Sequence, residues 1–125
     1  MSRIVYLNGD FVPLEEAKIP IMDRGFLFGD GIYEVTAVLD GRLVDNPAHL
    51  ERLDRSLKAI AIANPFSADD WTRLQTDLVR RNDLGEGLVY IEVTRGVFER
   101  DFLCPPDLAP SVVMFTQAKI VAESP

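Results

Sequence analysis

The side chains best suited to hold a ligand lie in residues 23–35, which read DRGFLFGDGIYEV. Glycine allows positive φ angles and close approach of a ligand or of another backbone. The segment runs into β-branched residues, so a strand would fix Tyr33 while its hydroxyl stays accessible. The same pattern is typical of a plain turn that enters a strand, and the residues alone leave both interpretations open.

Arg52 is a second candidate for binding an anion. It lies at the margin of the apolar stripe of a predicted helix, where its planar guanidinium can present two parallel donors to a phosphate or carboxylate. The other interpretation is a surface arginine that pairs with Glu51 or Asp54, and an isolated pair of this kind contributes little. The residues alone favour this surface role.

Two further cations, Arg95 and Arg100, follow a predicted strand. Two arginines at a strand exit can clamp an anionic group. They can equally be neutralised by their own neighbours Glu92, Glu99 and Asp101, which is the more common outcome.

The remaining reactive side chains do not form a recognisable site. His49 is the only histidine and has no cluster of Cys or carboxylate residues around it, so packing at a helix start is expected and no metal site is predicted. Cys104 has no base partner visible in the sequence. Lys18, Lys58 and Lys119 are the only lysines, and none stands where burial would lower the pKa of its amine.

The composition narrows the class of protein. A chain of 125 residues, 47% hydrophobic and 26% charged, is long enough for one globular domain with a core. Its formal charge of −7, with the acidic residues scattered, disfavours binding to nucleic acid or to anionic lipid. No apolar run could span a membrane, no signal peptide is evident, and one cysteine allows no intrachain disulfide. A cytoplasmic protein is therefore expected.

Periodicity and turn residues predict an α+β domain. Asn8-Gly9-Asp10 predicts a hairpin between two short strands, and Asp40-Gly41 predicts a second one. Two amphipathic helices are expected, the first capped by Asn46 and ending at Asn64-Pro65, the second capped by Ser67. Strands are predicted at 4–7, 11–12, 33–39, 42–44, 88–94 and 111–117. We expect a mainly antiparallel sheet with the two helices packed on one face.

The order and spacing of these segments resemble the N-terminal domain of the class IV (fold-type IV) pyridoxal-phosphate aminotransferases. Within that family the likeness is greatest to the D-amino-acid (D-alanine) aminotransferases. The motifs that carry it are Leu7-Asn8-Gly9, the segment from Asp23-Arg24-Gly25 to Tyr33-Glu34, Asp40-Gly41, His49-Leu50-Glu51-Arg52-Leu53, the run from Tyr90 to Gly96, and Arg100.

The resemblance implies roles for four side chains toward pyridoxal 5'-phosphate (PLP) and its substrates. Arg52 matches the arginine that grips the cofactor phosphate, which replaces the surface role favoured above. Tyr33 matches a tyrosine on the substrate side of the cofactor, and Val35 would line the small substrate pocket. Arg100 matches an arginine that traps the substrate α-carboxylate, generally in the active site of the partner subunit of a homodimer.

Three positions match the family less closely. Glu34 and Tyr90 are expected to support the residues that touch the ligands. The D-alanine aminotransferases usually carry a histidine two residues after the trapping arginine, where this chain has Phe102. A phenyl ring donates no hydrogen bond to a carboxylate, so the preferred amino acid is left open.

The resemblance also implies what lies outside the chain. The family's catalytic lysine belongs to the C-terminal domain, so residues 1–120 are expected to form the small N-terminal domain and 121–125 the start of an interdomain linker. The chain alone would then be inactive. The full-length protein would transfer an amino group between a D-amino acid and a 2-oxo acid. Alternatives are an aminodeoxychorismate lyase or a branched-chain aminotransferase of the same family, or a non-catalytic dimerisation or binding module.

Overall fold

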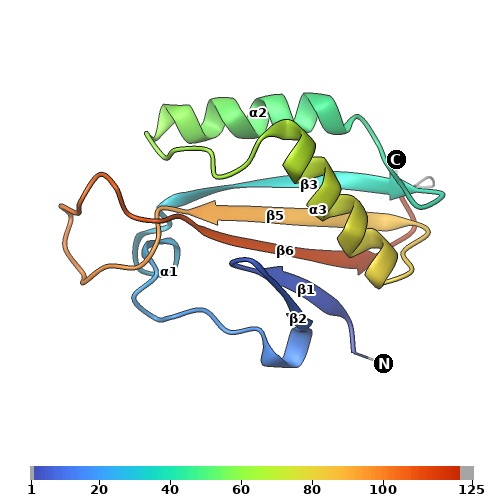
Figure 1. Cartoon of the computed structure of the whole chain (residues 1–125), viewed down its shortest axis with the longest axis horizontal. Helices are drawn as coiled ribbons and strands as arrows, with labels where there is room; N and C mark the ends of the chain where they lie inside the picture. Colours follow the sequence, from blue (N-terminus) through green and yellow to red (C-terminus); the bar gives the residue numbers. More distant parts are fainter. Residues whose placement is uncertain (1, 122–125) are drawn as a thin grey trace.

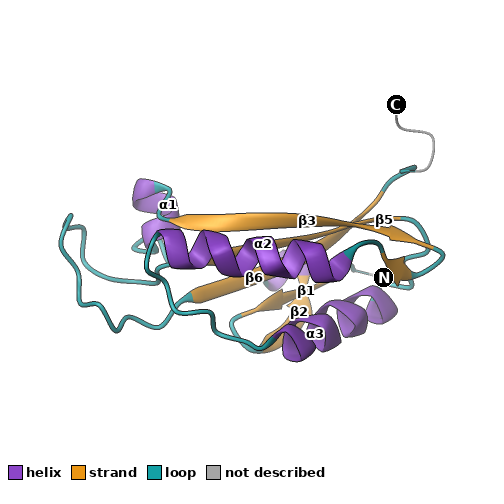
Figure 2. Ribbon diagram, turned by 90° about the horizontal axis from the view of Figure 1, so that it is seen from above, coloured by secondary structure: helices purple, strands orange, loops and turns teal. Residues whose placement is uncertain are grey.

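The computed structural model describes residues 2–121, which form one six-stranded sheet with two long helices on one face (Figure 1, Figure 2). Of the expected linker 121–125, residues 122–125 lie outside the described part. The strands are β1 (Ile4–Leu7), β2 (Asp10–Pro13), β3 (Gly31–Leu39), β4 (Arg42–Leu43), β5 (Gly87–Thr94) and β6 (Ser111–Ala118); the helices are α1 (Arg24–Phe28), α2 (Asn46–Ala59) and α3 (Ala68–Arg81), with a 3₁₀ turn at Leu14–Glu16.

All pairs in the sheet are antiparallel, in the order β2-β1-β6-β5-β3-β4. The predicted α+β class, with its antiparallel sheet and two helices on one face, is confirmed. The outermost strand β4 pairs only with Val38 and Leu39 of β3. The first part of β3, from Gly31 to Ala37, therefore forms an open edge of the sheet.

The core lies between the helices and the sheet. It is built from alternate residues of each strand, because successive side chains of a strand point to opposite faces. The apolar stripes predicted for the two helices meet these residues. The most deeply buried members are Leu53 and Leu57 of α2, Trp71 and Leu78 of α3, and Val38, Val89, Ile91, Val93 and Met114 of the sheet.

The prediction that Asn46 caps the first helix is wrong. The capping position belongs to Asp45, which adopts a left-handed conformation (φ 53°) and makes no side-chain cap. Asn46 is instead buried as the first helical residue, and its amide donates to Oε1 of Gln75 (3.0 Å) and Oγ1 of Thr72 (3.2 Å). The asparagine thus joins the two helices. A polar residue before Pro47 looks the same in sequence whether it caps a helix or crosses to another one.

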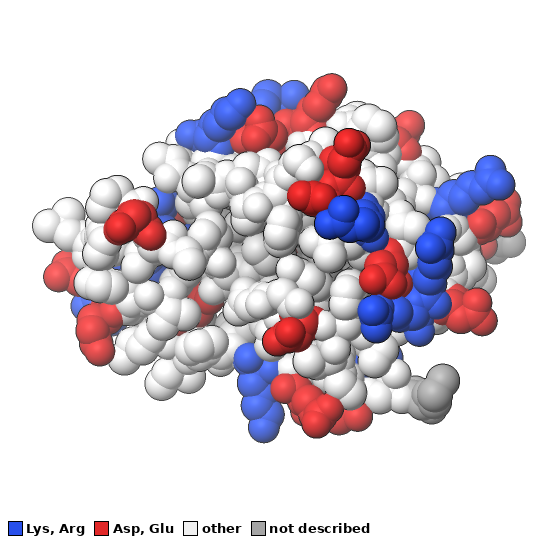
Figure 3. All heavy atoms as spheres, viewed as in Figure 1, with Lys and Arg blue, Asp and Glu red and all other residues white. Residues whose placement is uncertain are grey.

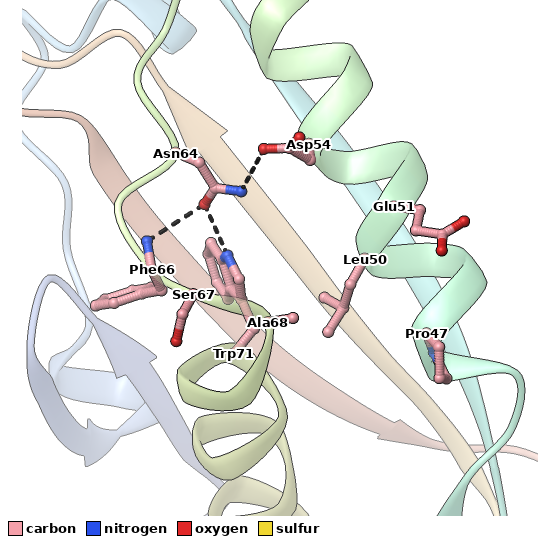
Figure 4. Close-up of a pocket in the computed structure, with 9 residues that line it drawn as sticks. All are labelled: Pro47, Leu50, Glu51, Asp54, Asn64, Phe66, Ser67, Ala68 and Trp71. Atoms are coloured by element: carbon pink, nitrogen blue, oxygen red, sulfur yellow. Dashed lines mark hydrogen bonds between the residues drawn. The ribbon is translucent and has the colours of Figure 1, made fainter.

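The first helix also ends earlier than predicted. It stops at Ala59 and not at Asn64, because Ala61 takes a positive φ of 57°. Asn64 organises the connection to α3: its Oδ1 accepts from Nε1 of Trp71 (2.9 Å) and its Nδ2 donates to Asp54 (3.1 Å). Figure 4 shows these bonds at the edge of a hollow of about 400 Å³ between α2 and α3.

Residues 24–28 form the short helix α1, where the sequence suggested a glycine-rich loop. Asp23 caps it by accepting from the backbone N–H of Gly25 (2.8 Å), and Gly29 ends it in a left-handed conformation (φ 64°). Helix α1 lies at the end of the sheet where β3 begins (Figure 1). The turn residues were correctly identified, but they bound one turn of helix.

Charged residues of both signs are mixed over the face that carries α2 and α3 (Figure 3). No single-sign patch dominates this view, as the scattered acidic residues of the sequence suggested. Among residues 2–121, no helix combines the length and the apolar character needed to cross a bilayer.

Gly87→Ala is expected to destabilise the fold by about 1–3 kcal/mol, the usual cost of overpacking. A Cβ at this position would collide with the carbonyl oxygen of Gln117 and lie 3.0 Å from Cα of Ala118, both in the backbone of β6. Urea denaturation followed by the fluorescence of Trp71 measures the loss. Gly85→Ala is the control, because a Cβ there meets nothing within 4 Å. Equal stability of the two variants would contradict the prediction.

Candidate functional site

Three consecutive residues of β3 divide between the two faces of the open sheet edge. Tyr33 and Val35 point away from the helices and are 66% and 37% exposed. Glu34 points between them toward α2 and is only 3% exposed. The strand thus fixes an accessible phenol and a small apolar side chain on one face, and a buried carboxylate on the other.

The buried carboxylate of Glu34 is held by two side chains of α2. Arg52 donates to it through Nε (2.9 Å, to Oε2) and Nη2 (2.7 Å, to Oε1), and Nδ1 of His49 lies 2.8 Å from Oε1. Burial raises the pKa of Glu34, but the hydrogen bonds from Arg52 and His49 outweigh it and hold that pKa below its usual value. Glu34 is therefore ionised at neutral pH and fixes the direction of Arg52.

Arg52 retains donors for a second anion. Its side chain is 60% exposed, and the bonds to Glu34 use only Nε and one side of Nη2. The hydrogen bond and the charge of Glu34 raise the pKa of Arg52, so the guanidinium stays charged. The predicted surface partners are wrong, since Arg52 pairs with Glu34, while Asp54 pairs with Lys58 (2.8 Å).

Arg52 and Tyr33 reach the open edge of β3 from opposite faces. Arg52 comes from the helix side and Tyr33 from the bare side, and the charge distribution around Tyr33 contributes to the raised pKa of Arg52. A ligand lying along this edge can touch both side chains without entering the core.

An aromatic row covers the bare face beside Tyr33. The ring of Tyr90 stacks on Tyr33 (5.8 Å between centroids) and on Phe115 (4.7 Å). The hydroxyl of Tyr90 donates to Glu92 (2.5 Å). Burial, followed by the bond to Glu92, raises the pKa of Tyr90 well above its usual value, so this phenol stays protonated and cannot act as a base.

Arg100 lies in the loop 95–110, which extends beyond the sheet at the end where β3 begins (Figure 1). Its guanidinium carbon lies 5.3 Å from the ring centre of Phe28 and 5.7 Å from that of Phe102. Within residues 2–121, no carboxylate forms an ion pair with it, and no hydrogen bond or ring contact joins it to Tyr33 or Arg52. One copy of the chain therefore brings together Arg52, Tyr33 and Val35, but not Arg100.

The partners suggested for Arg95 are wrong. Arg95 donates through Nε to Asp30 (2.7 Å) rather than to Glu92, Glu99 or Asp101. The bond from Arg95 reaches from the end of β5 to the start of β3, which are adjacent in the sheet. A contact of this kind follows from strand pairing and not from proximity in the sequence.

Sequence reasoning missed the role of His49, which was assigned to packing. The signal was present: His49 and Arg52 are three residues apart, so they lie on the same side of α2 and can converge on one carboxylate. Cys104 is half-buried and has a free thiol. No group of three or more His, Cys, Asp or Glu residues in the described range is placed to hold a metal ion.

Glu34→Gln is expected to destabilise the protein at pH 7, with a loss that shrinks on acidification. The folded-state pKa of Glu34 lies below its ordinary value of 4.5, so its stabilisation is present above pH 4.5 and is lost as the pH falls through the folded pKa. Urea midpoints at pH 7, 5 and 3 measure the difference between variant and parent. The exposed residue Glu51, changed to Gln, should show no such trend, and a loss for Glu34→Gln that is constant with pH would refute this assignment.

Relatives of the chain come from bacteria. It is 40% identical over 115 residues to the D-alanine aminotransferase of Staphylococcus aureus (strain MSSA476), covering 91% of this chain and 41% of that protein. It is 36% identical over 118 residues to the D-alanine aminotransferase of Listeria monocytogenes serotype 1/2a (strain 10403S), covering 94% and 41%. The chain therefore spans about two fifths of the length of these relatives.

Solved structures share the fold at lower identity. The branched-chain amino acid aminotransferase of Escherichia coli superposes with a TM-score of 0.88 at 20% identity, covering 95% of this chain and 40% of that one. A second branched-chain amino acid aminotransferase, from T.th. and determined with pyridoxamine 5'-phosphate, gives a TM-score of 0.87 at 19% identity over 99% and 42%. The family model for amino-transferase class IV matches residues 31–123, which is most of the chain. The resemblance read from the motifs is thus confirmed, and the chain belongs to the class IV aminotransferase family.

Proposed function

We propose that the full-length protein is a PLP-dependent aminotransferase that moves an amino group between a D-amino acid and a 2-oxo acid. The observation that carries this proposal is the arrangement at the open edge of β3. There Arg52, oriented by the buried Glu34, keeps free donors beside the exposed Tyr33. Family membership and the D-alanine aminotransferase relatives support the reaction type.

The residues present fit the cofactor. A charged guanidinium with free donors on a rigid helix suits a phosphate group, so Arg52 would hold the phosphate of PLP. Tyr33 and Val35 would lie on its substrate side. When bound, PLP supplies an electron sink for breaking the bond between Cα and hydrogen. The lysine that moves this proton would belong to a part of the protein outside this chain, so residues 1–120 act by binding and orientation.

Arg100 would bind the α-carboxylate of the substrate. It has a free guanidinium at the end of the molecule but no contact with Tyr33 or Arg52 of its own chain. This separation is what a homodimer requires if Arg100 enters the site of the partner subunit. Phe102 beside it is 79% exposed and offers no donor, so Arg100 and Tyr33 would hold the carboxylate without help from position 102. We place the enzyme in the cytoplasm.

Assays of the purified full-length protein test the proposal. The protein should bind PLP with a visible absorbance band and transfer the amino group of D-alanine to 2-oxoglutarate. Transfer from L-valine or L-leucine alone would favour a branched-chain aminotransferase, and release of pyruvate from aminodeoxychorismate without an amino acceptor would favour the lyase. Failure to bind PLP, or a native mass of one chain of this length without activity, would overturn the proposal in favour of a binding module.

A further inference from the structure

The loop 95–110 is long and contains no helix or strand of its own, yet it carries Arg100. Long loops are mobile unless specific contacts hold them. Two backbone contacts fix its beginning: Val97 forms an isolated bridge with Asp23, and the N–H of Phe98 donates to the carbonyl of Met22 (3.2 Å). These contacts end two residues before Arg100, so they do not fix its position.

Arg24 provides the contact at that point. It is the most buried cation of the region, with its side chain 7% exposed. Its Nη1 donates to the backbone carbonyl of Asp101 (2.6 Å), between Arg100 and Phe102. Its Nε donates to Asp30 (3.0 Å), and its own backbone N–H donates to the carbonyl of Gly96 (2.8 Å). One side chain therefore ties the middle of the loop to the start of β3.

The ring of Phe28 adds a second link between the same residues. The guanidinium carbon of Arg24 lies 4.7 Å from its centre and that of Arg100 lies 5.3 Å away. The ring of Phe102 packs against Phe28 at 5.5 Å. Arg24 and Arg100 therefore share one aromatic ring, and a shift of the Asp101 backbone moves Arg100 relative to it.

Asp30 makes the burial of Arg24 tolerable. Its Oδ2 accepts from both Arg24 (3.0 Å) and Arg95 (2.7 Å). Arg95 in turn donates through Nη2 to the carbonyl of Ile60 (2.6 Å), just after α2. The carboxylate thus connects the start of β3, the exit of β5 and the helix that bears Arg52.

We propose that Arg24 is a positioning residue for Arg100: by holding the carbonyl of Asp101, it sets where the Arg100 guanidinium meets the substrate carboxylate. This inference rests on the proposed function and deepens it by naming a residue that controls carboxylate recognition. Arg24 is buried and does not touch the substrate. Its effect passes through the backbone of Asp101 and the ring of Phe28.

Arg24→Lys in the full-length protein with PLP bound tests the inference. Lysine keeps the charge opposite Asp30 but lacks the fork that also reaches the carbonyl of Asp101. Amide hydrogen exchange of residues 99–103 should rise while that of β5 stays unchanged. The KM for D-alanine should rise about 10- to 100-fold with a smaller change in kcat, because misplacing a binding group by about 1 Å has effects of this size. The Kd for PLP should not change.

A double-mutant cycle shows whether Arg24 acts through Arg100. If it does, Arg24→Lys should raise KM in the parent but not in the Arg100→Met background. Arg42→Lys, at an exposed position on β4, is the matched control and should change neither exchange nor KM. An equal rise of KM in both backgrounds, or unchanged exchange in the loop, would overturn the inference.

Other outcomes separate this inference from the proposed function. If Arg100→Met leaves KM unchanged while Arg24→Lys loosens the loop, the tether stands and the role proposed for Arg100 fails, and with it the effect on the substrate. If Arg24→Lys raises exchange in β5 as well, the variant is globally loosened. Phe28→Leu then replaces it, because this change removes the shared ring and leaves the bonds to Asp30 in place. Unchanged exchange and KM in Phe28→Leu would overturn the inference.

Discussion

Replacing Arg52 by Met is expected to weaken the binding of PLP to the full-length protein about 10- to 100-fold, the range for losing a charge-assisted hydrogen bond pair. Glu34 directs the guanidinium toward the open edge of β3 and occupies only part of its donors. Methionine keeps the length of the side chain but provides no donor. Titration of the apo-protein with PLP, followed by absorbance, measures the change in Kd.

The control for this experiment is Arg55→Met, because Arg55 is an exposed arginine three residues further along α2. It removes the same charge from the same helix, so it accounts for any general electrostatic effect on phosphate affinity. The prediction requires Arg55→Met to bind PLP like the parent. A similar loss of affinity in both variants would mean that net charge, and not a specific phosphate contact, determines binding.

Asp30→Asn is expected to lower the free energy of unfolding by about 3 kcal/mol, at the low end of the range for breaking a buried ion pair. Its Oδ2 is the only carboxylate oxygen within ion-pair distance of either Arg24 or Arg95 in the described part of the chain. Asparagine leaves two largely buried guanidinium groups without a counter-charge. Urea denaturation at pH 7, followed by Trp71 fluorescence, measures the loss.

Asp77→Asn is the matched control, because it removes the carboxylate of an exposed pair. Asp77 and Arg81 are 43% and 47% exposed in their side chains, and such pairs contribute about 0–1 kcal/mol. Burial raises the pKa of Asp30, but the hydrogen bonds from Arg95 and Arg24 outweigh it and hold that pKa below its usual value. The difference between Asp30→Asn and the parent should therefore shrink below about pH 4. Equal losses for both variants at pH 7 would contradict the role given to Asp30.

The architecture could be predicted from local patterns. The alternation in β5 and the helical spacing of Leu50, Leu53 and Leu57 identify core faces, and Asn8-Gly9 identifies a hairpin. Ser67 caps α3 as predicted, by accepting from the N–H of Asp70 (3.1 Å). Each of these features depends on residues that are close in the sequence.

What could not be predicted depends on contacts between distant residues. Asn46 caps nothing because Gln75, on another helix, accepts its amide proton. Arg52 pairs with Glu34 across the layer between helix and sheet, and a nearby carboxylate on its own helix was the wrong partner. For the same reason the roles of Arg52, Tyr33, Val35 and Arg100 toward ligands stay predictions, since one chain without its ligand and partner displays only their positions.

The most direct test of the account is a crystal structure of the full-length protein with pyridoxamine 5'-phosphate. The account predicts a phosphate oxygen within about 3 Å of the Arg52 guanidinium, the distance of a charge-assisted hydrogen bond, with the Tyr33 hydroxyl on the side of the pyridine ring where substrate enters. A phosphate bound elsewhere, with Arg52 bonded only to Glu34 and the edge of β3 covered by protein, would contradict it.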